Sequence, residues 1–119
     1  MYGVFFAQGG IHKMQISALF KDGQLELRFT GELDHHAAKE AMCEIGRTID
    51  LNLPRDCVMD FGGLTFMDSS GIAVVLNTHK RMQEIGGRTQ VRNVLPQPMK
   101  VLTASGIYRV VEIAETVEK

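Results

Sequence analysis

The sequence predicts an α/β domain, in which a mixed β-sheet of four to five strands carries helices mainly on one face. Three observations lead to this fold class. Two strand-like segments joined by a turn open the chain, strand-like and helix-like segments then alternate, and each helix-like segment has one apolar side. Strands that alternate with helices are expected to pair in parallel through right-handed crossovers, whereas a hairpin adds an antiparallel pair.

The opening hairpin is predicted from alternation with a period of two residues. Residues 14–20 alternate inward and outward positions, and residues 25–30 do so again, which is typical of half-buried strands. Asp22 and Gly23 lie between these runs, and Asp-Gly is a strong hairpin signal. We assign residues 14–119 to one domain and treat residues 1–13 as a lead-in segment that is at most partly ordered.

Three helices and three further strands are predicted after the hairpin. Apolar residues at helical spacing define the helices, and short apolar runs between them indicate the strands. Asp34 is the expected N-cap of the first helix, and Gly106 is the expected stop of the third. The predicted helices span about residues 34–50, 72–85 and 98–105, and the strands span about residues 57–61, 89–92 and 110–113.

Composition excludes several classes of function. The chain has 119 residues, 45% of them hydrophobic and 23% charged, which is usual for one globular domain. Its net charge of −1 gives no electrostatic footprint for direct binding of nucleic acid. No apolar run approaches the roughly 20 residues of a membrane helix, and no secretion signal is visible. We therefore expect a cytoplasmic protein that makes no membrane contact, with Cys43 and Cys57 as two buried free thiols.

The usual catalytic and metal-binding motifs are missing from the sequence. His35 and His36 are adjacent in a predicted helix, where neighbours point about 100° apart, so we expect them to serve at the surface or as caps rather than as metal ligands. A nucleophile elbow would need glycine two residues either side of Ser70, where Asp68 and Ile72 stand instead. No phosphate-binding loop of the usual kind is present. We therefore expect that the protein binds no metal and no cofactor and that it is not an enzyme.

One stretch remains with unexplained polar residues, and it runs from Phe66 to Ile72 at the start of the second predicted helix. The simplest interpretation is that Asp68 and Ser69 only cap this helix, which stabilises it by about 1 kcal/mol. A cap does not require two serines, however, so one hydroxyl would be free beside apolar neighbours. A helix N-terminus, with its dipole and free N–H groups, is also a favourable place for a phosphate.

Two motifs give the chain a family resemblance. The run Gly-Glu-Leu-Asp-His-His-Ala at residues 31–37 and the run Phe-Met-Asp-Ser-Ser-Gly-Ile at residues 66–72 together resemble STAS domain proteins, and among them the anti-sigma factor antagonists. The first run is similar to that of the antagonists of the sigma-F anti-sigma factor, which act in sporulation. The resemblance covers about residues 14–114 and implies the same mixed sheet with helices on one side.

The resemblance also implies a function. The unphosphorylated antagonist binds an anti-sigma factor, which is a serine kinase, and so releases a sigma factor. The kinase then phosphorylates the second serine of the motif, here Ser70, which ends binding until a phosphoserine phosphatase restores it. Two alternatives stay open: a STAS module of another partner-switching pathway, in stress or biofilm control, and a nucleotide-binding STAS domain. The expected partner-binding residues are Asp34, His35, Phe66, Met67, Asp68, Ser69, Ser70, Gly71 and Ile72.

Overall fold

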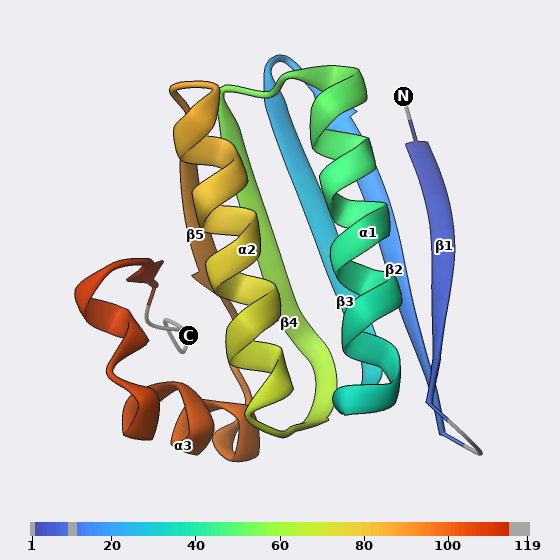
Figure 1. Ribbon diagram of the computed structural model, residues 1–119, viewed down its shortest axis with the longest axis vertical. Helices are drawn as coiled ribbons and strands as arrows, with labels where there is room; N and C mark the ends of the chain where they lie inside the picture. Colours follow the sequence, from blue (N-terminus) through green and yellow to red (C-terminus); the bar gives the residue numbers. More distant parts are fainter. Residues whose placement is uncertain (1, 10–11, 115–119) are drawn as a thin grey trace, which may run out of the picture.

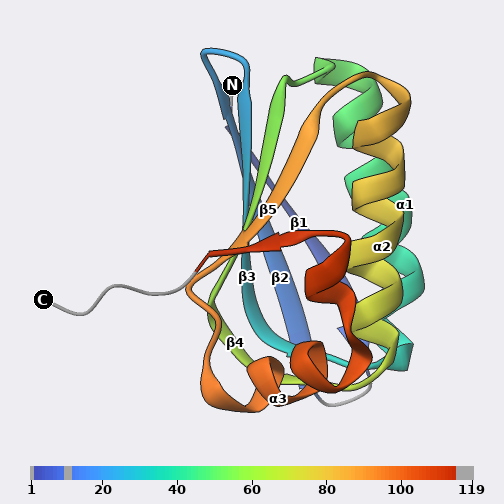
Figure 2. The ribbon, with the colours of Figure 1, turned by 90° about the vertical axis from the view of Figure 1, so that its left-hand side faces the viewer.

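A computed structural model describes residues 2–9 and 12–114 and shows a six-stranded mixed sheet with two helices packed side by side on one face (Figures 1 and 2). The strands lie in sequence order across the sheet. In chain order the elements are β1 (Tyr2–Gly9), β2 (His12–Lys21), β3 (Gln24–Leu33), α1 (His35–Asn52), β4 (Asp56–Met67), α2 (Ser70–Glu84), β5 (Arg88–Arg92), α3 (Pro96–Ser105), a short 3-10 helix (Ile107–Arg109) and β6 (Glu112–Ile113).

The predicted class and layering are confirmed, but the sheet has more strands than the four to five expected. The additional strand is β1, which pairs with β2 in antiparallel register from Tyr2 opposite Leu19 to Gly9 opposite His12. It lies in the segment that we treated as a lead-in. The division at residue 14 stays a prediction, and residues 1, 10–11 and 115–119 lie outside the described residues.

The hairpin and the crossovers follow the predicted pattern. β2 and β3 are antiparallel around Asp22 and Gly23, which both have positive φ as a tight hairpin turn requires. β3, β4, β5 and β6 are parallel, each joined to the next through a helical segment. α1 and α2 cover the same face of the sheet, and neither of them lies on the opposite face, which we call the open face (Figure 2).

β4 is longer than predicted because it continues through Gly62 and Gly63. Register shifts in its pairing with β3 accommodate this extension. A side-chain carbon at Gly63 would lie 2.9 Å from the backbone oxygen of Phe29, so glycine permits this close approach of the two strands. The extension brings the end of β4 to Met67, directly before the serine motif.

Helix α1 begins as predicted, and the last strand is shorter than predicted. Asp34 is the N-cap of α1, and its Oδ1 accepts hydrogen bonds from the backbone N–H groups of His36 at 3.0 Å and Ala37 at 3.1 Å. Gly106 ends α3 in the left-handed conformation. Val110 ends the 3-10 helix instead of opening a strand, so β6 keeps only Glu112 and Ile113.

The two cysteines differ, and the expectation that both are buried is wrong. Cys43 is exposed on α1, whereas Cys57 on β4 is buried in the core. Burial raises the pKa of the Cys57 thiol from 9.0 to about 12. The unfolded chain therefore loses this proton first as the pH rises, so the contribution of Cys57 to stability declines between about pH 9 and 12.

We predict that only Cys43 reacts quickly with an aromatic disulfide reagent at pH 8, because a buried, protonated thiol is neither accessible nor nucleophilic. Cys43→Ser should abolish the fast phase, measured by absorbance, and Cys57→Ser should leave it intact. Two fast-reacting thiols in the native protein would contradict the burial of Cys57.

Candidate functional site

Three helices begin at the same end of the molecule. α1, α2 and α3 follow the parallel strands β3, β4 and β5, so the N-termini of the three helices gather at the carboxyl-terminal end of these strands (Figure 1). In open α/β sheets, functional sites are usually built at this end of the strands. The stretch from Phe66 to Ile72 lies here, between the end of β4 and the first turn of α2.

The carboxylate of Asp68 connects two of these helices. Its Oδ1 accepts a hydrogen bond from the backbone N–H of Ser70 at 2.8 Å, and its Oδ2 accepts one from the backbone N–H of His35 at 3.1 Å. The backbone N–H of Asp68 donates a hydrogen bond to the backbone carbonyl of Leu33 at 3.2 Å, which fixes the turn to the end of β3. The negative charge of Asp68 thus stabilises the N-termini of both α1 and α2, where the helix dipoles are positive.

Asp68 and Ser69 were both predicted to cap α2, but only one of them does so. Asp68 does serve the start of α2, as expected. Ser69 occupies the N-cap position but makes no side-chain capping hydrogen bond, and its side chain is exposed. An aspartate one residue earlier can replace a capping serine because its short side chain bonds the backbone two residues on.

Ser70 is the first residue of α2 and is half-buried. Within residues 2–9 and 12–114, its hydroxyl has no hydrogen-bond partner, and the same holds for Ser69. The geometry therefore leaves both hydroxyls available for modification or for contact with another molecule. The preference for Ser70 over Ser69 comes from the family resemblance.

Gly71 and Met67 have packing roles that sequence reasoning missed. We expected Met67 and Gly71 to be partner-binding residues, but both are buried. A side-chain carbon at Gly71 would lie 2.2 Å from Cγ and 2.5 Å from Sδ of Met67. Because Gly71 has no side chain, Met67 can pack against its backbone. Phe66 offers the exposed apolar surface, at 38% exposure, and Ile72 packs partly against the core.

Gln97 is a second residue that sequence reasoning missed. Its side-chain Oε1 accepts a hydrogen bond from the backbone N–H of Met67 at 2.8 Å, and its Nε2 donates to the Met67 carbonyl at 3.1 Å. This pair of bonds joins the first turn of α3 to the last residue of β4. A single glutamine in a helix start carries no sequence signal, because only the fold brings it to β4.

His35 and His36 lie against one another, although neighbouring residues of a helix point about 100° apart. Their ring centroids are 3.9 Å apart with an interplanar angle of 38°, and both residues are exposed. The spacing of about 100° holds for residues inside a helix, whereas His35 is the first residue of α1 and its side chain can turn back along the surface. No group of three or more potential ligands that could hold a metal ion occurs in the described part of the chain.

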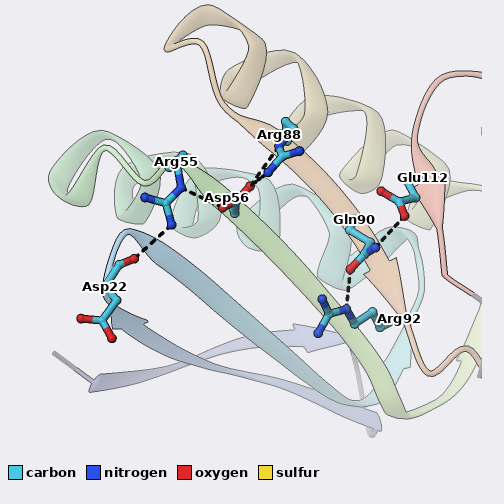
Figure 3. A network of polar contacts seen from close by, with 7 residues as sticks. All are labelled: Asp22, Arg55, Asp56, Arg88, Gln90, Arg92 and Glu112. Carbon is cyan, nitrogen blue, oxygen red and sulfur yellow. Dashed lines mark hydrogen bonds and ion pairs between the residues drawn. The ribbon is translucent and has the colours of Figure 1, made fainter.

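The open face of the sheet offers a competing site, but its charges neutralise one another. Arg88 and Arg92 line a shallow cavity of about 230 Å³ together with Asp56 and Glu112. Arg88 pairs with Asp56 at 3.1 Å, while Gln90 bonds both Arg92 and Glu112 (Figure 3). Exposed pairs of this kind contribute little energy.

Among the described residues, no helix is long and apolar enough to cross a membrane.

Comparison with known proteins identifies the family. Residues 15–119 match the STAS domain model, so the chain belongs to the STAS domain family. An anti-sigma F factor antagonist from Paenibacillus polymyxa is 32% identical over 100 residues, which are 84% of this chain and 86% of that protein. The family resemblance predicted from the two motifs is therefore confirmed.

Two solved structures of SpoIIAA are also similar. One is the anti-sigma factor antagonist in its unphosphorylated form, with a TM-score of 0.75, covering 87% of this chain and 89% of that one. The other is the Bacillus cell fate determinant in its phosphorylated form, with a TM-score of 0.67, covering 87% of this chain and 92% of that one. Both are 29% identical to this chain, and they share its fold.

We predict that Asp68→Ala destabilises the domain by about 1–2 kcal/mol, because two helix N–H groups lose their acceptor. Ser69→Ala, one residue away, should change stability by less than about 0.5 kcal/mol since its hydroxyl makes no capping bond. Urea unfolding followed by circular dichroism measures both. Equal losses for the two variants would mean that the serine caps α2 in solution.

We also predict that Gly71→Ala costs about 1–3 kcal/mol, because the new methyl group overlaps Met67. In a Met67→Ala background the same substitution should cost less, since the atoms that it meets are gone. The free energy of unfolding of the four proteins gives the coupling. An unchanged cost in the Met67→Ala background would show that the overlap is not the cause.

Proposed function

We propose that the protein is an anti-sigma factor antagonist, a binding module that phosphorylation of Ser70 switches off. The observation that carries this proposal is the hydroxyl of Ser70, the first residue of α2, which has no hydrogen-bond partner among the described residues and belongs to the Asp-Ser-Ser-Gly motif of a STAS domain. One relative bears the name anti-sigma F factor antagonist, and SpoIIAA has been solved in both unphosphorylated and phosphorylated forms.

The surface around Ser70 suits a protein partner. Phe66, His35 and Ser69 are exposed at this end, and Ile72 is partly accessible. An aromatic ring beside small polar groups is a common composition for a binding surface. Asp68 fixes the start of α2 relative to α1, so the partner meets a preorganised surface and little ordering is lost on binding.

A phosphate on Ser70 would change this surface without unfolding it. It adds about −1.5 to −2 charges close to Asp68. Burying that charge against a partner that had accommodated a neutral hydroxyl costs several kcal/mol unless the partner supplies cations. Since about 1.4 kcal/mol is a tenfold change in affinity, this penalty suffices to end binding.

The remaining partners follow from this mechanism. The anti-sigma factor acts as the serine kinase and supplies the ATP, so this chain is its substrate and has no catalytic activity of its own. A phosphoserine phosphatase returns the chain to the binding form. The setting is the cytoplasm, where sigma factors act, and the process is sporulation, as the resemblance of the two sequence motifs implies.

We predict that incubation with the cognate anti-sigma kinase and ATP adds a single phosphate, at Ser70. Tandem mass spectrometry of the digested protein locates it. Ser69→Ala should still be phosphorylated, whereas Ser70→Ala should bind the anti-sigma factor with unchanged affinity and resist inactivation. Ser70→Asp should bind at least about tenfold more weakly in calorimetry, because one charge reproduces part of the phosphate's effect.

Two results would contradict the proposal. A phosphate on Ser69 alone would move the switch by one residue, and equal binding of Ser70→Asp and the unmodified protein would remove the charge mechanism. Saturable, tight binding of ATP or GTP by the isolated chain would instead favour the nucleotide-binding alternative. Binding to a stress or biofilm kinase in preference to a sporulation kinase would favour the other partner-switching pathway.

A further inference from the structure

A phosphate at Ser70 finds no free backbone donors in the helix that carries it. The N–H of Ser70 donates to the Asp68 carboxylate, the N–H of Gly71 donates to the Asp68 carbonyl at 3.0 Å, and the N–H of Ile72 donates to the Ser69 carbonyl at 3.1 Å. The free N–H groups that we expected at this helix start are therefore already bonded. The dipole remains, but Asp68 already occupies the favourable position for an anion.

The neighbouring helix offers no free donors either. At the start of α1, the N–H of His35 donates to Asp68, and those of His36 and Ala37 donate to the Asp34 side chain. The N–H of Ala38 donates to the Asp34 carbonyl at 3.0 Å. The first N–H groups of α1 and α2 are thus already bonded, and a cationic partner for the phosphate has to be a side chain.

Side chains that can become cations are scarce around the site. The segments 29–38, 56–78 and 93–99 contain the ends of β3 and β4 and the starts of the three helices, and they have no lysine or arginine, although β5 ends at Arg92. His35 and His36 are the only residues in these segments that can carry a positive charge. Two carboxylates of the site, Asp34 and Asp68, have their hydrogen bonds to helix N–H groups, and Glu32 is a third acid at the end of β3.

His35 and Ser70 are neighbours across the Asp68 carboxylate. Their backbone N–H groups bond its two oxygens, at 3.1 and 2.8 Å. The ring of His36 lies on the ring of His35, and both are exposed. Lys39, one turn further along α1, is the next basic residue of that helix and is also exposed.

We propose that the His35–His36 pair is the intramolecular partner of the phosphate on Ser70. In the unmodified protein the two rings lie together, with their centroids 3.9 Å apart. Once Ser70 carries the phosphate, one imidazole takes up a proton from water and donates an N–H hydrogen bond to a phosphate oxygen. The phosphorylated site then folds onto the start of α1 and withdraws part of the binding surface. This inference rests on the proposed function, because it concerns the phosphorylated form of the same site.

The test uses protein with phosphoserine installed at position 70 during translation, so it does not depend on any kinase. Imidazole signals are followed by NMR between pH 5 and 9 in the phosphorylated and unmodified proteins. The titration midpoint of at least one ring of the pair should rise by about one pH unit on phosphorylation. His79, further along α2, is the internal control and should not move.

Matched variants assign the effect. His35→Gln together with His36→Gln should lower the melting temperature of the phosphorylated protein at pH 6.5 and leave that of the unmodified protein unchanged. Lys39→Gln should leave the rise in the imidazole midpoint intact. Inorganic phosphate added to the unmodified protein should not reproduce the rise, which shows that the covalent phosphate is required.

Midpoints that stay unchanged in protein carrying phosphoserine at position 70 would overturn the inference. They would leave the proposed function standing, because loss of partner binding is measured separately. Conversely, a midpoint rise in a phosphorylated protein that still binds the anti-sigma factor would support the histidine pair and overturn the switch.

Discussion

The geometry of the site depends on one carboxylate. Asp68 accepts hydrogen bonds from the first residues of α1 and α2, at 3.1 and 2.8 Å, and its own N–H is bonded to the end of β3. Each helix start would otherwise leave donors without acceptors. The two helices are thereby fixed to one another at the end where Ser70 lies, while their apolar faces are held on the sheet by the core. Gln97 extends the same connection to α3.

Periodicity and turn chemistry were sufficient for most of the fold. The hairpin, the three helices and the parallel order follow from local patterns, because amphipathic spacing and an Asp-Gly turn report on local structure. The strand at Tyr2–Gly9 was missed since a segment with aromatic residues and glycines shows no clear alternation. β4 was predicted too short because its two glycines read as a loop, whereas here they permit close approach of β3.

The candidate site was only partly predictable, and for a physical reason. The motif that contains Ser70 is contiguous, so sequence alone located it. The contacts that shape it join residues more than 25 positions apart, as in the bonds from Asp68 to His35 and from Gln97 to Met67. Such contacts have no local pattern. The same lack explains why Met67 and Gly71 were interpreted as surface residues when they pack together in the interior.

The discontinuous origin of these contacts determines what another protein can recognise. A peptide spanning residues 66–72 contains the whole Asp-Ser-Ser-Gly motif but neither Leu33 and His35 on one side nor Gln97 on the other. Its Asp68 would have no second helix to bond, and its serines would sample many backbone conformations. The proposed partner would therefore recognise a folded surface and not a linear epitope, so the proposed switch at Ser70 depends on the integrity of the native sheet.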